Sequence, residues 1–365
     1  MAAIKLGDFV KITFQDSGDV AITQLDTGTV CLYLQDTVTY VGVYHLTNVN
    51  QIPTTLAEEN QEYLRLAFRG KPRKVIAVVQ EGTATALDVD TTKLGILETL
   101  TFDYLAFPGI DSTDATAVAT WVEGVNANPI HRFSCVLPNT AGDDWHIINF
   151  TQETVTVDGK VYNTSQATAY AAGAIAAVVP NQSMTMHTAD VDSCSAMTIA
   201  EIDKAGEDGE LVMFDDGDNV RFANDTNSLT TLDPTTQDES YQDIRCVAIM
   251  DLFYNSCKIA ILEKYIGKYA NTYQNKLMLV GEIYGLLKEF ENAGLCEQGD
   301  TNVSINLEAQ TSYLRSISYR TADGRGVDDM TQDEILRANT KKKVFLKVRM
   351  IPVSAIEAVE ILVET

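Results

Sequence analysis

The chain has 365 residues, of which 45% are hydrophobic, and its 51 acidic and 27 basic side chains give a formal net charge of −24 at pH 7. This acidic excess argues against DNA, RNA and anionic membranes as main partners, because clusters of Lys and Arg hold those ligands. No apolar run approaches the roughly 18 residues that span a bilayer. The length predicts one large domain or two ordinary ones.

The first 25 residues are not expected to fold compactly by themselves. They lack the basic, apolar and cleavage regions of a signal peptide, so we expect the chain to be made and kept in a cytoplasm until release by another route. Residues 9–14 alternate like a strand, and 15–19 read as a turn. A hairpin this small is marginal alone, so it is predicted to pair with a strand of the same or another chain.

From residue 29 onward, short apolar strands alternate with helices. The predicted helices cover residues 54–69, 91–100, 111–126 and 164–179, and Thr54 or Thr55 is expected to cap the first of them. The predicted strands cover residues 29–34, 75–79, 102–107, 132–137 and 145–150. Strands that are apolar on both faces and alternate with helices are typical of βαβ units and a mostly parallel sheet.

The remaining segments outside the two long helices show both strand and helix patterns. Residues 154–162 read as strand with an Asp-Gly turn, and 197–206 as a short helix. Strands at 209–214 and 219–223 are predicted to form a hairpin. Further along, a segment at 303–307, a helix at 331–339 and strands at 344–350 and 358–363 are expected.

Two long helices, at 243–265 and 272–293, are the strongest helical signal. Asn271 and Thr272 are candidate N-caps of the second helix, and Gly294 is placed to end it in the left-handed conformation. Gly281 and Gly285 lie one turn apart inside that helix, which suggests close approach of another backbone. The connection between the helices contains Tyr265, Gly267, Lys268 and Asn271.

Motifs for catalysis or cofactor binding are missing. No Gly-x-Gly-x-x-Gly or Walker-type loop follows a predicted strand, and no cofactor is expected. His45, His131, His146 and His187 lie far apart, and His131 and His146 are interpreted as structural or surface residues. The pairs Asp143-Asp144 and Asp328-Asp329 show no acid–base pattern.

Metal and redox roles are not indicated either. Residues 215–219 look like a calcium loop, but Val220 and Thr226 occupy the places where an EF-hand needs Gly and Glu, so a hairpin turn is predicted. The chain has no Cys-x-x-Cys pair, so the cysteines are predicted to be reduced, buried and structural. They are Cys31, Cys135, Cys194, Cys246, Cys257 and Cys296.

The ordered set of these features resembles the contractile phage tail sheath family. Its members carry a long helix, a Tyr-x-Gly-Lys-x-x-Asn turn, a second helix that ends in Gly, and a strand-rich C-terminus. The turn matches at Tyr265, Gly267, Lys268 and Asn271. The likeness is to the small sheath proteins of Gram-positive contractile phages and of phage-tail-like bacteriocins such as diffocins. It covers the whole chain loosely and residues 160–365 well.

The resemblance implies an α/β fold with four parts. They are an N-terminal arm (1–25), a Rossmann- or flavodoxin-like outer domain (26–190), an α+β inner domain (191–351) and a C-terminal arm (352–365). Terminal strands would be exchanged between subunits. The residues expected in this exchange are Phe9, Val10, Lys11, Ile12, Thr13, Phe14, Val359, Glu360, Ile361, Leu362 and Val363.

By the same resemblance, the protein would polymerise helically around a tail tube and contract to drive the tube through a cell envelope. Expected partners are copies of itself, the tube protein, and baseplate and terminator proteins, with no nucleic acid and no membrane. It would assemble in bacterial cytoplasm and then belong to a released phage tail or tail-like particle. Two alternatives remain: another self-assembling tube or shell protein, and a small-molecule enzyme on the Rossmann-like layer.

Charge is distributed unevenly along the chain. Residues 190–243 hold 15 acidic and two basic side chains, whereas 315–349 hold nine basic and five acidic ones. Two solvated faces would explain this, and so would complementary patches that meet between copies. The candidate basic interface consists of Lys341, Lys342, Lys343, Lys347 and Arg349.

Overall fold

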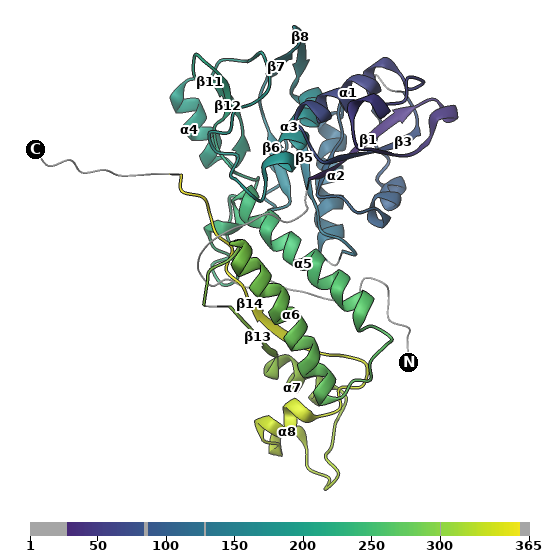
Figure 1. Ribbon diagram of the computed structural model, residues 1–365, viewed down its shortest axis with the longest axis vertical. Helices are drawn as coiled ribbons and strands as arrows, with labels where there is room; N and C mark the ends of the chain where they lie inside the picture. The colour runs from purple at the N-terminus through teal and green to yellow at the C-terminus, as the bar shows by residue number, and fades with distance from the viewer. Residues whose placement is uncertain (1–27, 84–86, 128, 300, 358–365) are drawn as a thin grey trace, which may run out of the picture. The chain divides into compact units, whose positions relative to one another are not determined.

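The computed structural model of the chain describes residues 28–83, 87–127, 129–299 and 301–357 (Figure 1). These residues form two compact units. The sheet unit contains residues 28–252 and 354–357, and the helical unit contains residues 253–353.

The centre of the sheet unit is a seven-stranded sheet with the order β10-β6-β5-β4-β1-β3-β2. All neighbours are parallel except β2, which pairs antiparallel with β3 at one edge. The mostly parallel sheet predicted from the sequence is therefore confirmed. The strands are β1 (Thr29–Asp36), β2 (Gly42–Leu46), β3 (Lys74–Glu81), β4 (Tyr104–Ala106), β5 (Ser134–Pro138), β6 (Ile147–Phe150) and β10 (Glu210–Leu211).

Helices cover both faces of this sheet, which is why its strands are apolar on both sides. Val30 and Leu32 of β1 pack in a cluster with α1 (Glu58–Arg69) and α3 (Thr164–Val178). The alternate residues Cys31 and Tyr33 pack in a second cluster with α2 (Ser112–Asn126) and the 3₁₀ helix η4 (Thr91–Thr99). The period-2 alternation of side chains thus divides each strand between two cores.

Helices α1 and α3 touch through their backbones. A Cβ atom added to Gly173 of α3 would lie 2.1 Å from the carbonyl oxygen of Ala67 in α1. One added to Gly70, directly after α1, would lie 2.2 Å from the amide nitrogen of Ala174. Neither position has room for a side chain, because backbone atoms cannot move aside as a flexible side chain does.

We therefore expect Gly173→Ala to lower the free energy of unfolding by at least about 1–3 kcal/mol through overpacking. The control is Gly124→Ala on α2, where an added Cβ would meet no atom within 4 Å. That change should be neutral or should stabilise by up to about 1 kcal/mol, because alanine is the better helix former. Urea unfolding of both variants measures this, and a Gly173→Ala protein as stable as the control would contradict the packing argument.

Smaller elements complete the sheet unit. The predicted Asp-Gly turn joins β7 to β8, with Asp158 at φ 51° and Gly159 at φ 76°, as a type I′ hairpin requires. These elements are β7 (Thr154–Val157), β8 (Lys160–Asn163), β9 (Ser193–Cys194), β11 (Met213–Asp215), β12 (Val220–Phe222), α4 (Ile199–Glu207), η2 (Val38–Tyr40), η3 (Val49–Gln51) and η5 (Glu239–Tyr241).

The helical unit contains the end of α5 (Ile244–Lys264), all of α6 (Tyr273–Ala293) and a two-stranded antiparallel sheet of β13 (Asn302–Ile305) and β14 (Leu346–Arg349). Helix α6 buries Ile283, Leu287 and Phe290 at helical spacing. Thr272 caps α6 by accepting from the N–H of Asn275, and Gly294 ends it at φ 68°. The remaining elements are α7 (Leu307–Ser316), η6 (Val327–Asp329) and α8 (Gln332–Arg337).

Several sequence predictions differ from the structure. Helix α1 begins at Glu58 rather than near residue 54, because the N–H of Ala57 is taken by the carboxylate of Asp36 at 2.7 Å and Thr54 and Thr55 lie in a turn. The helix expected at 91–100 is a 3₁₀ helix. Strand β2 and helix α7 were not predicted, since β2 is half exposed at the sheet edge and lacks an apolar run.

The boundary between the two compact units falls within α5, and not at residue 190 as expected. Residues 191–252 join the sheet unit because β9 pairs with β7 and β10 pairs with β6. The division into outer (26–190) and inner (191–351) domains remains a prediction. Both expected exchange strands, 9–14 and 359–363, lie outside the described residues.

Candidate functional site

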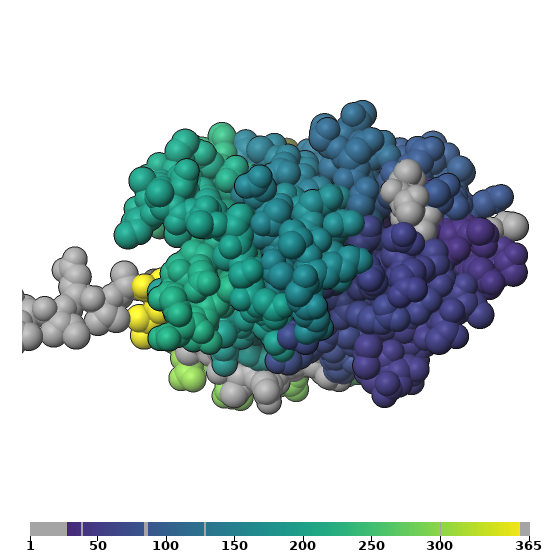
Figure 2. Space-filling model, turned by 90° about the horizontal axis from the view of Figure 1, so that it is seen from above, coloured from purple at the N-terminus to yellow at the C-terminus, as the bar shows by residue number. Residues whose placement is uncertain are grey.

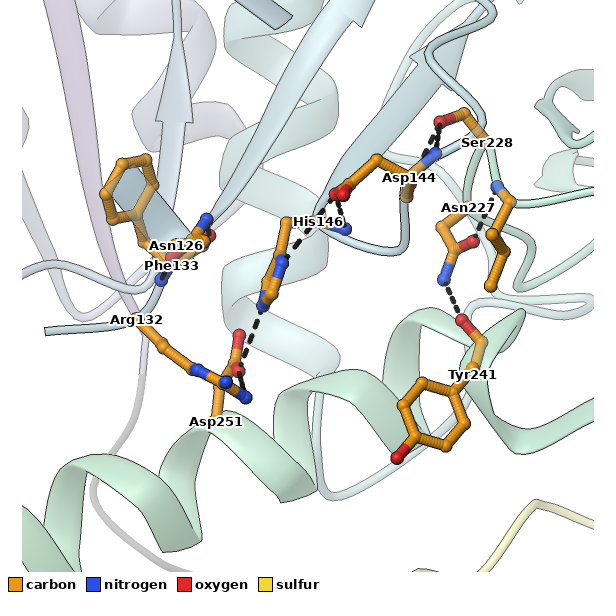
Figure 3. Close-up of polar contacts among 10 residues, drawn as sticks. Asn126, Arg132, Phe133, Asp144, His146, Asn227, Ser228, Tyr241 and Asp251 are labelled. Carbon is orange, nitrogen blue, oxygen red and sulfur yellow. Dashed lines mark hydrogen bonds and ion pairs between the residues drawn. The ribbon is translucent and has the colours of Figure 1, made fainter. Parts of the chain in front are cut away.

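Four charged side chains of the sheet unit meet in a buried cluster (Figure 3). Arg132 lies just before β5, Asp144 and His146 just before β6, and Asp251 on α5. Nε2 of His146 is 3.2 Å from Oδ1 of Asp251, and Nδ1 is 3.7 Å from Oδ1 of Asp144. Nη1 of Arg132 is 3.8 Å from the same Asp251 oxygen. His146 is only 1% exposed, so the cluster joins α5 to the amino ends of two strands.

Electrostatics favour an ionised cluster. Burial lowers the pKa of His146, but Asp251 and Asp144 outweigh burial and leave that pKa raised. Burial raises the pKa of Asp144, but His146 and Arg132 outweigh it and leave that pKa lowered. Two carboxylates thus face two cations, and the Trp145 ring packs against both cations.

The location of this cluster fits a structural role. In open α/β sheets ligands bind beyond the carboxyl ends of the strands, and these residues lie at the amino ends. At the carboxyl end of β1, the carboxylate of Asp36 accepts hydrogen bonds from the N–H of Ala57 and the side-chain amide of Asn60. The interpretation of His146 as structural is therefore supported by its burial and its partners.

The other candidate residues are also bonded within the fold. Nε2 of His131 lies 2.8 Å from the carbonyl oxygen of Phe102. Asp143 accepts the N–H groups of Thr230 and Thr231. The pairing of Asp144 with His146 was not predicted, although only one residue separates them in the sequence. The exposed carboxylate of Asp328 pairs with Arg315 at 2.6 Å.

Because the pKa of His146 is raised in the folded state, its contribution to stability should be fully present below the unfolded-state value of about 6.5 and lost as the pH rises through the folded value. The stability difference between wild type and His146→Gln should therefore shrink between pH 6 and pH 8.5. Urea unfolding followed by fluorescence measures it, since both tryptophans, Trp121 and Trp145, lie in the sheet unit. His45→Gln replaces an exposed histidine and serves as the control. A difference that grows with pH would contradict this assignment.

No group of three or more potential metal ligands occurs in the part of the chain that the structure describes. The calcium-like segment is the predicted hairpin turn: Asp216 accepts the N–H groups of Asp218 and Asn219 and pairs with Arg221. All six cysteines are free, and every one except Cys194 is buried. Among the described helices, none combines the length and apolar composition needed to cross a bilayer.

The four turn residues shared with the sheath family organise one end of the helical unit. The side-chain amide of Asn271 donates to Oγ1 of Thr340 at 3.0 Å and to the carbonyl oxygens of Lys341 and Lys343 at 3.1 and 2.9 Å. Asn271 thus holds the lysine-rich loop, whereas Thr272 caps the helix. Gly267 adopts φ 75° in the turn, and the hydroxyl of Tyr265 donates to the carbonyl of Met278.

The loop that Asn271 holds carries positive charge without local compensation. Of the five basic candidates, Lys341, Lys342 and Lys343 lie on this loop, and Lys347 and Arg349 lie on β14. Lys341 has φ 56°, and its N–H donates to the side-chain oxygen Oδ1 of Asn339 at 2.8 Å. Within the described residues, none of the four lysines forms an ion pair, although five other basic side chains of the helical unit do.

Among the residues that the structure describes, none closely approaches Gly281 or Gly285. A Cβ at either position would meet no atom within 4 Å. Both glycines lie on a face of α6 that also exposes Leu277, Met278 and Tyr284. Close approach of another backbone at this face therefore remains a prediction.

Comparison with known proteins agrees with this arrangement of a doubly covered sheet and a helical pair. The model of the phage tail sheath protein central domain matches residues 82–228, and that of the phage tail sheath C-terminal domain matches residues 236–364. The chain belongs to the phage tail sheath protein family. The tail sheath protein of Clostridium phage phiCD119 is 30% identical over 97% of this chain and 98% of its own length.

Solved sheath structures share the fold. A sheath tail protein from Listeria innocua superposes with a TM-score of 0.67 at 16% identity, covering 91% of this chain and 96% of its own. The helical sheath of the anti-feeding prophage in its contracted state gives a TM-score of 0.65 at 14% identity, covering 98% of both chains. The mixed α/β fold expected from the resemblance is confirmed.

Proposed function

We propose that this sheath protein polymerises helically around a tail tube and contracts to drive the tube through a target envelope. The observation that carries the proposal is the match to a phage tail sheath protein over nearly the full length of both chains. A fold shared with the contracted anti-feeding prophage sheath supports it. Contraction would release the free-energy difference between two packings of the same subunits, without a cofactor or hydrolysis.

The partners follow from this role. They are further copies of the chain, the tube protein, and the baseplate and terminator proteins at the ends of the tail. Assembly would take place in the bacterial cytoplasm, and the sheath would leave the cell as part of a phage tail or tail-like particle. A structural role fits the internal hydrogen bonding of His131, His146 and the Asp143-Asp144 pair.

Copies would be connected by strand exchange at the small sheet of the helical unit. Strands β13 and β14 pair only with each other among the described residues. A two-stranded sheet is marginal alone, and its open edges can accept further strands. Strands 9–14 and 359–363 of neighbouring copies would add there by main-chain hydrogen bonding. Such head-to-tail contacts do not close on themselves, so they generate a helical array.

A chain truncated after Glu357 should remain folded and monomeric but should not polymerise, because it lacks the strand donated to a neighbour. Thermal melting tests the fold, and sedimentation with negative-stain electron microscopy tests assembly. Ile361→Pro in the full-length chain is the matched variant, since proline blocks ladder pairing without shortening the chain. Normal tubes from the truncated protein would refute strand donation, and unfolding would mean that the strand pairs within its own copy.

We further propose that unlike charges align the copies. Residues 28–252 hold 32 acidic and 11 basic side chains, whereas residues 253–353 hold 12 acidic and 14 basic ones. The basic candidates on the Asn271-held loop and β14 would face the acidic stretch 190–243 of a neighbour. In that stretch α4 and the β11–β12 turn expose Asp203, Glu207 and Asp218.

The double variant Lys341→Glu with Lys342→Glu should polymerise more slowly than wild type, with monomer melting almost unchanged. Exposed pairs contribute only about 0–1 kcal/mol each, so the effect depends on repetition over many interfaces. Raising salt should slow wild-type assembly too, because the screening length is already about 8 Å at 0.15 M. Arg65→Glu with Lys93→Glu makes the same charge change elsewhere and is the control. The charge contact would be contradicted if the rate of wild-type assembly did not depend on salt and the double variant polymerised as fast as wild type.

A further inference from the structure

The segment from Ser354 to Glu357, called the strap, belongs to the expected C-terminal arm and lies on the sheet unit, just before the expected exchange strand 359–363. Figure 2 shows this end of the chain in yellow against the green surface. The hydroxyl of Ser354 donates to Oδ2 of Asp243 at 2.7 Å. At the other end, the hydroxyls of Ser183 and Thr185 donate to Oε1 of Glu357 at 2.7 and 2.8 Å. The strap is therefore held at two points.

The contacts of the strap are few, and Ser354, Ile356 and Glu357 are themselves exposed. Among the described residues, 354–357 form no backbone–backbone hydrogen bond. Ile356 is 89% exposed, so apolar burial does not hold the strap either. Hydroxyl–carboxylate hydrogen bonds at a wet surface exchange readily with water, because the net contribution of each is small. The strap can thus detach without disturbing a core.

In contrast, the two segments to which the strap is bonded are linked to each other by buried hydrogen bonds. Asp225 is buried, and its carboxylate accepts the N–H of Met184 at 3.0 Å and that of Arg245 at 3.2 Å. It therefore links the segment that contains Ser183 and Thr185 to the first turn of α5. Nε of Arg245 donates to the carbonyl oxygen of Pro180 at 3.1 Å. Both anchor points consequently belong to one cross-linked frame.

We propose that the strap is a releasable anchor that sets the free length of the C-terminal arm. This inference rests on the proposed donation of strand 359–363. While the strap is held, only Ala358 separates Glu357 from that strand. Release would add residues 354–357 to this linker, which would then have five residues. At about 3.3–3.6 Å per extended residue, the free reach increases from about 3.5 Å to about 17 Å.

The added linker length is needed when neighbouring copies move relative to one another. A strand donated across an interface stays paired only if the linker spans the new separation of donor and acceptor. Release of the strap supplies that length at a defined place, so the array stays connected while its subunits shift. Ser354 and Glu357 are thus positioning residues of the arm.

The chain offers a reversible way to lock the strap. Sγ of Cys246 lies 3.5 Å from Oγ of Ser354, so Ser354→Cys would place a second thiol beside a native one. Oxidation should join the two sulfurs at about 2.05 Å and hold the strap closed, and dithiothreitol should reopen it. Mass spectrometry of the purified particles would verify the disulfide.

Tail particles built with Ser354→Cys sheath would be treated with mild urea and scored as extended or contracted by negative-stain microscopy. Oxidised particles should assemble but contract at least tenfold less often than the same particles after reduction. Ser354→Cys with Cys246→Ala cannot form the disulfide, and oxidation should leave its contraction unchanged. Oxidised single-variant particles that contract as often as reduced ones would overturn the inference.

A second variant tests the released state of the strap. It can be used even if the disulfide variant does not fold. Ser354→Ala with Glu357→Ala should release the strap, which should increase the mobility of a spin label attached at the exposed position 356 and lower the rate of tube formation at least severalfold. Unchanged label mobility and unchanged assembly would also overturn the inference. Failure of strand donation itself is recognised separately, because the chain truncated after Glu357 would then still form tubes.

Discussion

Carboxylates that accept backbone N–H groups stabilise the sheet unit at the starts of its strands and helices. Asp103 accepts from Gly28 and Thr29 at the start of β1, and Asp36 accepts from Ala57 at the start of α1. Asp225 does the same at the start of α5. Each contact satisfies a donor that the regular element leaves without a partner, and a negative charge near a helix N-terminus is favourable. Part of the acidic excess therefore has an internal structural role.

The polar cluster at His146 extends the same arrangement to side chains. Asp251 on α5 meets Arg132 and His146 at the amino ends of β5 and β6. Removing one partner of a buried ionic group leaves an uncompensated charge, which typically costs about 3–5 kcal/mol. The position of the first part of α5, residues 244–252, within the sheet unit is thus specified by charge as well as by packing. The strap lies close to the start of the same helix, through Asp243.

The fold could be predicted wherever the signal was local. Strands apolar on both faces indicated β1 and β3, and Thr272 and Gly294 delimited α6. Contacts between distant residues could not be predicted in this way. His146 and Asp251 are 105 positions apart, and Asn271 reaches a loop 70 positions further along. Strand β2 was missed because an edge strand needs no apolar run, and α1 started late because Asp36 captures the N–H of Ala57.

The order of strands in the large sheet has a consequence for biosynthesis. Strand β10 covers the outer edge of β6, yet it is made about 180 residues after β1. At roughly 5–20 residues per second, a ribosome needs about 10–35 s to extend the chain that far. During this time the growing sheet presents an open edge. Residues 28–209, which precede β10, hold 22 acidic and nine basic side chains, and this negative charge disfavours association between nascent chains at that edge.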